Sequence, residues 1–125
     1  MRWFQKSQEP DVWQVADNRP LGDIEAAQKI REICSAAGSI AAKVAAGGRR
    51  AEQGNETERY QAAIKCALEI AMKISDDSMR DVSVSQIIAL CMKVDLLKTA
   101  KILVRAIKAE RTREELIAEY PALRG

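Results

Sequence analysis

The sequence predicts an all-α protein, a compact bundle of four to five helices built on an antiparallel helical hairpin, with an extended N-terminal arm. Apolar residues recur at spacings of three and four, and strand-forming residues are scarce beside abundant alanine. Glycine or helix-capping residues separate the apolar stretches. With 47% apolar and 30% charged residues among 125, residues 22–125 should fold as a single helical-bundle domain.

Composition also narrows the available chemistry. Histidine is absent, which removes the commonest general base and most zinc sites. Cys34, Cys66 and Cys91 fall on or beside apolar helical faces, so we expect them to be core residues. No apolar run reaches the ~20 residues that span a bilayer, and the first residues lack the apolar core of a signal peptide. We therefore expect a cytoplasmic protein that is not an enzyme, with no cofactor, no metal and no membrane partner.

Residues 1–21 are expected to form the extended arm, because Pro10, Pro20 and scattered polar residues argue against regular structure. Three of the five aromatic residues nevertheless lie here: Trp3, Phe4 and Trp13. Aromatic side chains are costly to leave in water, so the arm should pack on something. It lies either across its own bundle or on a partner, for which tryptophan is a typical anchor.

The most apolar stretch runs from Tyr60 to Ile74, where the polar residues Lys65, Glu69 and Lys73 share one narrow stripe. A helix that is apolar around most of its circumference is one that other helices surround, so we expect this to be the central helix. A preceding helix over 23–46 carries a matching seam, and the two should form the hairpin.

The loop between these two helices contains Arg49 and Arg50 directly after Gly47 and Gly48. Two guanidinium groups beside glycine amides could bind a phosphate or carboxylate. The spacing matches no phosphate-binding loop, however, and a helix stop followed by a solvated turn is the simpler interpretation.

Three capping-box patterns predict where the other helices begin, at Asn55, Ser83 and Thr112. The second opens a short helix that reaches about Val94. Asp95 then caps a helix over Leu96–Glu110, or the two run on as one bent helix. The third opens a last short helix that Pro121 ends. No internal repeat is expected.

Positive charge is concentrated late in the chain. Residues 82–113 carry seven basic side chains against only Asp95 and Glu110, whereas residues 1–81 and 114–125 have balances of −1 and −2. Four of the basic residues line one face of the predicted helix 96–110 and two follow it: Lys98, Lys101, Arg105, Lys108, Arg111 and Arg113. Such a basic face can bind an acidic protein or the phosphates of a nucleic acid.

Residues 85–107 also resemble a degenerate helix-turn-helix, in which Lys98, Thr99 and Lys101 would lie nearest the base edges. Two features depart from that pattern. Lys93 stands at a turn position that often carries glycine, and Leu96 and Leu97 stand where exposed polar residues would be needed.

Three function classes follow from these observations. We favour a small non-enzymatic interaction module, of the regulator or inhibitor type, that binds an acidic protein partner through the basic helix. The first alternative is a nucleic-acid-binding protein that uses helix 96–110. The second is a self-assembling structural subunit, such as a homodimer, favoured by the alanine-rich seams and the aromatic arm.

Overall fold

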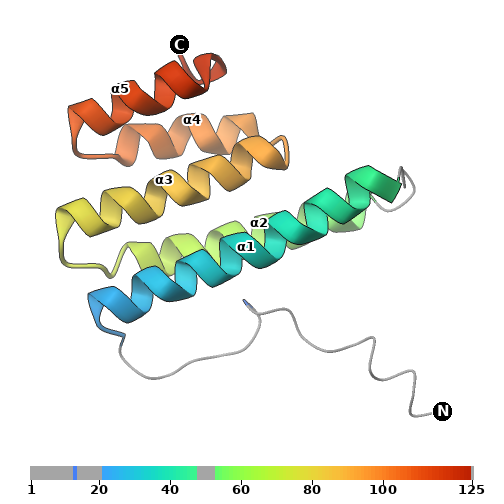
Figure 1. Cartoon of the computed structure of the whole chain (residues 1–125), viewed down its shortest axis with the longest axis horizontal. Coiled ribbons are helices and arrows are strands. Elements are labelled where there is room, and N and C mark those ends of the chain that lie inside the picture. Colours follow the sequence, from blue (N-terminus) through green and yellow to red (C-terminus); the bar gives the residue numbers. More distant parts are fainter. Residues whose placement is uncertain (1–12, 14–20, 48–52, 125) are drawn as a thin grey trace.

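The computed structural model describes residue 13 and residues 21–47 and 53–124, of which residues 46–47 and 53–55 are described by their backbone alone. The prediction of an all-α bundle of four to five helices is confirmed. The described elements are α1 (Asp23–Gly47), α2 (Gln53–Ala71), α3 (Asp77–Lys93), α4 (Leu97–Ala106), α5 (Glu110–Glu119) and a short 3-10 helix, η3 (Pro121–Leu123) (Figure 1). None of these helices is long and apolar enough to cross a lipid bilayer.

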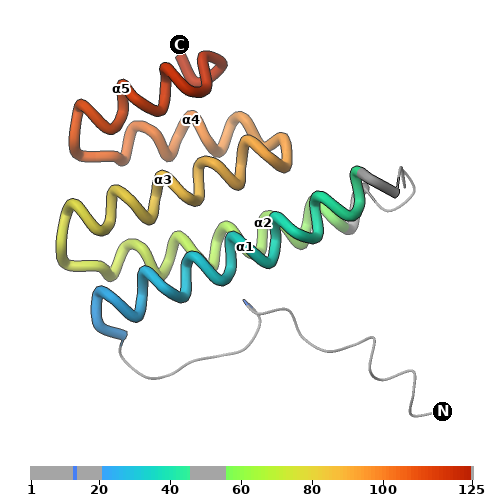
Figure 2. The backbone as a smooth tube through the Cα atoms, in the orientation of Figure 1, coloured from blue at the N-terminus to red at the C-terminus, as the bar shows by residue number. Residues whose placement is uncertain are grey.

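The chain reverses direction at each connection, so that α1, α3 and α5 run one way and α2 and α4 run the other (Figures 1 and 2). The hairpin of α1 and α2 has the predicted antiparallel form. The central helix, however, is α3, which packs against α1, α2 and α4. The prediction that the helix over 60–74 is central was wrong, because α2 packs against α1 and α3 and exposes the opposite side.

The core combines large aliphatic side chains with alanines at the helix contacts. Isoleucine and valine account for most of the largest fully buried side chains, while alanines let neighbouring helices approach closely. Among the completely buried residues are Ile30, Ile33, Ala37, Ala63, Ala67, Ala71, Ile87, Ile88 and Ala100.

The predicted helix starts were wrong for α2, α3 and α5. Helix α3 begins six residues before Ser83, and its N-cap is Asp76, whose carboxylate accepts the backbone N–H of Met79 at 2.8 Å. Ser83 is therefore a buried residue inside the helix. Asn55 and Thr112 likewise lie inside α2 and α5, which begin earlier.

The connection between α3 and α4 shows that they are two helices, as one of the two alternatives proposed. Asp95 has a φ of 66°, the left-handed conformation that commonly ends a helix. The N–H of Leu96 donates to Cys91 at 2.8 Å and that of Asp95 to Met92 at 3.4 Å. These two bonds form a Schellman motif, so Asp95 terminates α3 and does not cap α4.

Two aspartates hold the turns that precede α3 and α5. The carboxylate of Asp23, the first residue of α1, accepts the N–H groups of Ser75 and Asp76 at 2.9 and 3.0 Å. The buried carboxylate of Asp81 in α3 accepts those of Lys108 and Ala109, both at 3.0 Å. Asp23 thus joins the start of α1 to the turn before α3, and Asp81 joins the N-terminal part of α3 to the turn before α5.

In each of these two turns an arginine side chain donates a hydrogen bond to a backbone carbonyl. Arg80 in α3 donates to the carbonyl of Ile74 at 2.9 Å, and Arg113 in α5 donates to that of Ile107 at 2.6 Å, six residues back in both cases. Both isoleucines are buried. The α2–α3 and α4–α5 connections therefore share one turn design, although the sequence shows no internal repeat. Few identical residues carry it, which hides it from the sequence.

Replacing Asp81 with alanine should lower the free energy of unfolding by roughly 2–4 kcal/mol, because it removes a buried charged acceptor from two part-buried backbone hydrogen bonds. Urea unfolding followed by circular dichroism measures the change. The matched control is Glu114→Ala, an exposed carboxylate whose loss should change stability by no more than about 0.5 kcal/mol. Equal effects of the two substitutions would contradict this role for Asp81.

The two backbone N–H groups that Asp23 accepts lower the pKa of its carboxyl below the ordinary value. A carboxyl whose folded pKa is depressed stabilises the fold above its unfolded pKa and loses that contribution as pH falls through the folded pKa. Asp23→Asn should therefore destabilise the protein at neutral pH, and the difference from wild type should shrink below about pH 4. Urea titrations at several pH values test this, and a difference independent of pH would refute it.

Candidate functional site

The outer face of α4 is the part of the predicted basic surface whose cations have no ion-pair partner among the described residues. Helix α4 buries one side of its circumference in the bundle through Ala100, Leu103 and Val104. On the opposite side Lys98, Ile102 and Arg105 are exposed, and Lys101 is half-buried at the edge. The α4 outer face is defined by these four residues: Lys98, Lys101, Ile102 and Arg105.

No described carboxylate pairs with the cations of this face. Helix α4 has no acidic residue in its first turn. Within the described parts of the chain, no hydrogen bond or ion pair engages the side chains of Lys98, Lys101 or Arg105. Three positive charges within three turns of helix therefore create a local positive potential that an anionic partner would relieve.

The other three predicted basic residues do not belong to this face, which corrects the prediction of one helix over 96–110. Helix α4 ends at Ala106, and Ile107 has extended backbone. Lys108 forms an exposed ion pair with Asp77 at 3.7 Å, and Arg111 pairs with Glu115 at 3.5 Å. Arg113 donates to the carbonyls of Ile107 and Lys108 at 2.6 and 3.1 Å, so its guanidinium holds a turn.

Ile102 is the residue of this face that sequence reasoning missed. Its side chain is 65% exposed, although it is a large aliphatic residue in the middle of a helix. It lies one turn from both Lys98 and Arg105 on the helix surface. The signal was available, since Ile102 falls on the same helical side as these cations and opposite Leu103 and Val104.

The helix-turn-helix interpretation does not fit the arrangement of α3 and α4. In that motif the two helices cross at about 90–120°. Here α4 folds back beside α3 in an antiparallel pair (Figures 1 and 2). Thr99, which was expected near the base edges, is half-buried. The geometry of a recognition helix is therefore not present.

The remaining predicted contacts lie elsewhere. Trp13 is buried at 7% exposure in the chain's own core, so its ring is not available as an anchor for a partner. Trp3, Phe4, Arg49 and Arg50 fall outside the described residues.

The cysteines pack as core or half-buried residues. Burial raises the pKa of the Cys34 thiol to about 11 and that of Cys91 to about 12. Both thiols are therefore protonated at neutral pH, which makes them poor nucleophiles and poor metal ligands. Among the residues that the structure describes, no group of cysteine, aspartate and glutamate side chains could hold a metal ion.

Comparison of the chain with protein-family models, with curated proteins and with solved structures gives no match.

The exposed position of Ile102 predicts that it contributes little to folding. Ile102→Gln should change the free energy of unfolding by no more than about 0.5 kcal/mol, since glutamine also favours a helix. The neighbouring Leu103→Ala should cost roughly 2–5 kcal/mol because Leu103 is a core residue. Chemical denaturation measures both values. A large loss of stability in the Ile102 variant would show that the side chain packs within the protein.

Proposed function

We propose that this protein is a small non-enzymatic interaction module that binds an acidic protein partner through the α4 outer face. The observation that carries the proposal is the exposed Ile102 surrounded by cations that have no ion-pair partner among the described residues. Ile24, Met72 and Val82 are also more than half exposed, but Ile102 is the exposed apolar residue whose neighbours along its helix are cations without an ion-pair partner among the described residues.

The two kinds of side chain would contribute differently to binding. Burying Ile102 would supply about 1.5–3 kcal/mol, whereas an exposed ion pair supplies only about 0–1 kcal/mol. The cations would therefore mainly increase the association rate and orient the partner. A complementary surface combines an apolar group with flanking carboxylates, as on one side of an acidic amphipathic helix.

A nucleic-acid partner remains the second candidate, favoured by the three unpaired cations alone. Phosphate binding needs positive charge but gives no role to Ile102. The affinity for a nucleic acid would also fall steeply as the salt concentration rises. Self-assembly through this face is less favoured, because two copies would bring like charges together.

The test uses labelled probes and fluorescence anisotropy at low and physiological ionic strength. The probes are an amphipathic helical peptide with leucines flanked by glutamates, its glutamine counterpart, duplex DNA and single-stranded RNA. The acidic peptide should bind, and Ile102→Gln should weaken binding about tenfold, equivalent to about 1.4 kcal/mol. The triple variant Lys98→Glu, Lys101→Glu and Arg105→Glu should abolish it.

The matched control reverses the charge of three exposed lysines outside α4, namely Lys43, Lys65 and Lys73, so that the net charge changes equally. This control should bind the acidic peptide nearly as well as wild type does. Equal loss in both triple variants would mean that only net charge matters. Preferential binding of DNA or RNA, lost in the α4 variant and insensitive to Ile102→Gln, would replace the proposal by the nucleic-acid alternative.

A further inference from the structure

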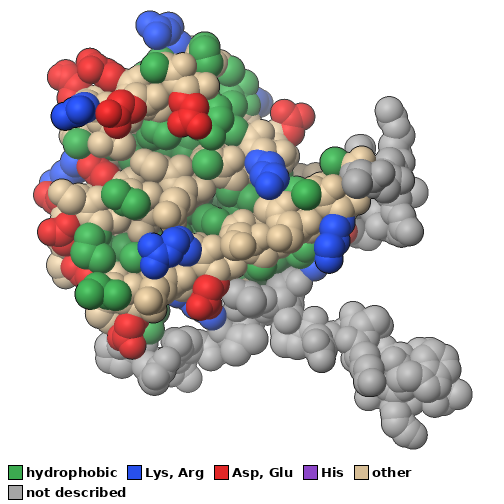
Figure 3. Space-filling view, viewed as in Figure 1, with side chains coloured by type: hydrophobic (Ala, Val, Ile, Leu, Met, Phe, Trp, Pro, Cys, Tyr) green, Lys and Arg blue, Asp and Glu red, His purple; other side chains and the backbone are tan. Residues whose placement is uncertain are grey.

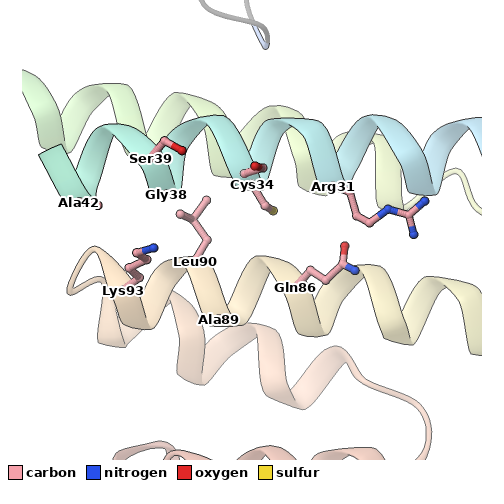
Figure 4. Close-up of a pocket in the computed structure, with 10 residues that line it drawn as sticks. Arg31, Cys34, Gly38, Ser39, Ala42, Gln86, Ala89, Leu90 and Lys93 are labelled. Carbon is pink, nitrogen blue, oxygen red and sulfur yellow. The ribbon is translucent and has the colours of Figure 1, made fainter.

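A groove between α1 and α3 forms a second surface, separate from the α4 outer face. It encloses about 610 Å³ and is lined by side chains from both helices (Figure 4). Its α1 wall is made largely of small residues, including Ser35, Gly38 and Ala42, and Ala89 and Leu90 contribute from α3. Small side chains on one wall allow the backbone of a bound molecule to approach the helix closely.

The groove extends along the two helices. Arg31 lines the main hollow and also a hollow of about 230 Å³ that reaches Ser78 and Val82 near the start of α3. Val82 is 57% exposed, so this end is apolar and open. In Figure 3 the surface between α1 and α3 is shallowly hollowed and bordered by isolated basic side chains.

One buried polar atom in this groove has no partner. The side-chain oxygen Oε1 of Gln86 is inaccessible to solvent and accepts no hydrogen bond from any described residue. Figure 4 shows Gln86 projecting from α3 toward α1, across the groove from Arg31. A buried amide oxygen without a donor is unfavourable. Gln86 is only half-buried, so rotation of its side chain would bring this oxygen into the groove, where a ligand's N–H group would donate to it.

Cations stand toward both ends of the main hollow. Arg31 and Lys93 are exposed, and neither forms an ion pair or hydrogen bond within the described part of the chain. The side chain of Lys93 lies over Gly38, where a Cβ atom would come 3.5 Å from its Nζ. No aspartate or glutamate lines this hollow.

The geometry points to a short extended segment of an acidic peptide as the occupant of the α1–α3 groove. Gln86 and Lys93 are two helical turns apart, about 10 Å, which is the length of about three extended residues. Carboxylates of such a segment would meet Arg31 and Lys93, and a backbone N–H would donate to Gln86 Oε1. A helical ligand fits less well, because its N–H groups are already bonded and its diameter is about 10–12 Å.

The test uses a blocked, labelled peptide with two carboxylates separated by two alanines. Matched probes are its Asn/Gln counterpart and a version with N-methylated backbone amides. Wild-type protein should bind the acidic peptide, with amide shifts in α1 and α3 and in the Gln86 side chain by NMR. Both matched probes should bind at least tenfold more weakly. Equal binding of the three peptides, or shifts confined to α4, would overturn the proposal.

Substitutions in the groove measure how much its cations and Gln86 each contribute to peptide binding. Arg31→Gln with Lys93→Gln should weaken binding at least tenfold, whereas the control pair Lys65→Gln with Lys73→Gln should not. Gln86→Leu should raise Tm, because it removes an unpaired buried oxygen, and should also weaken binding. A Gln86 variant that binds normally would refute the role of this residue. The Lys98, Lys101 and Arg105 triple-glutamate variant should still bind this peptide, which distinguishes this site from the α4 outer face.

Discussion

The fold depends on the carboxylate of Asp81, which is buried between α3 and the turn that opens α5. Two backbone N–H groups in that turn have no helical partner, and Asp81 accepts both at 3.0 Å. Asp23 does the same for the turn that opens α3, so each parallel helix fixes the start of the next. Because a hydrogen bond to a charged group contributes about 1.5–3 kcal/mol, these contacts favour one arrangement of the helices over alternatives with similar apolar burial.

This turn design also determines which cations are available to a partner. Arg80 and Arg113 bind backbone carbonyls within the turns, and Lys108 and Arg111 have carboxylate partners. The end of α4 at Ala106 separates Lys108, Arg111 and Arg113 from the α4 outer face, although these three residues continue the basic run in sequence. What remains on α4 is a smaller surface in which three cations accompany an exposed isoleucine. The affinity of such a surface should come mainly from the apolar contact, with charge providing orientation.

The α4 outer face and the α1–α3 groove share no residues, and each contains a feature that folding alone does not favour. On α4 this is an isoleucine that is 65% exposed, and in the groove it is a buried amide oxygen without a donor. Local violations of otherwise consistent packing are concentrated at functional sites in natural proteins. Two such features on different helices would allow one small domain to bind a folded acidic surface and an extended acidic segment separately.

The sequence by itself determined the helical class, the hairpin and most of the buried positions of α2, because apolar spacing records which side of a helix avoids water. It did not determine where α3 and α5 begin. Local capping patterns pointed to Ser83 and Thr112. The turns before α3 and α5 are instead held by hydrogen bonds to Asp23 and Asp81, which lie 52 and 27 positions earlier in the chain than Ser75 and Lys108. The central position of α3 was also decided by tertiary structure. The helical side on which Ile102 lies follows from its spacing, but only the absence of a covering helix leaves it 65% exposed among the described residues. Periodicity defines the apolar side of a helix, but only the neighbouring helices decide how much of that side they cover.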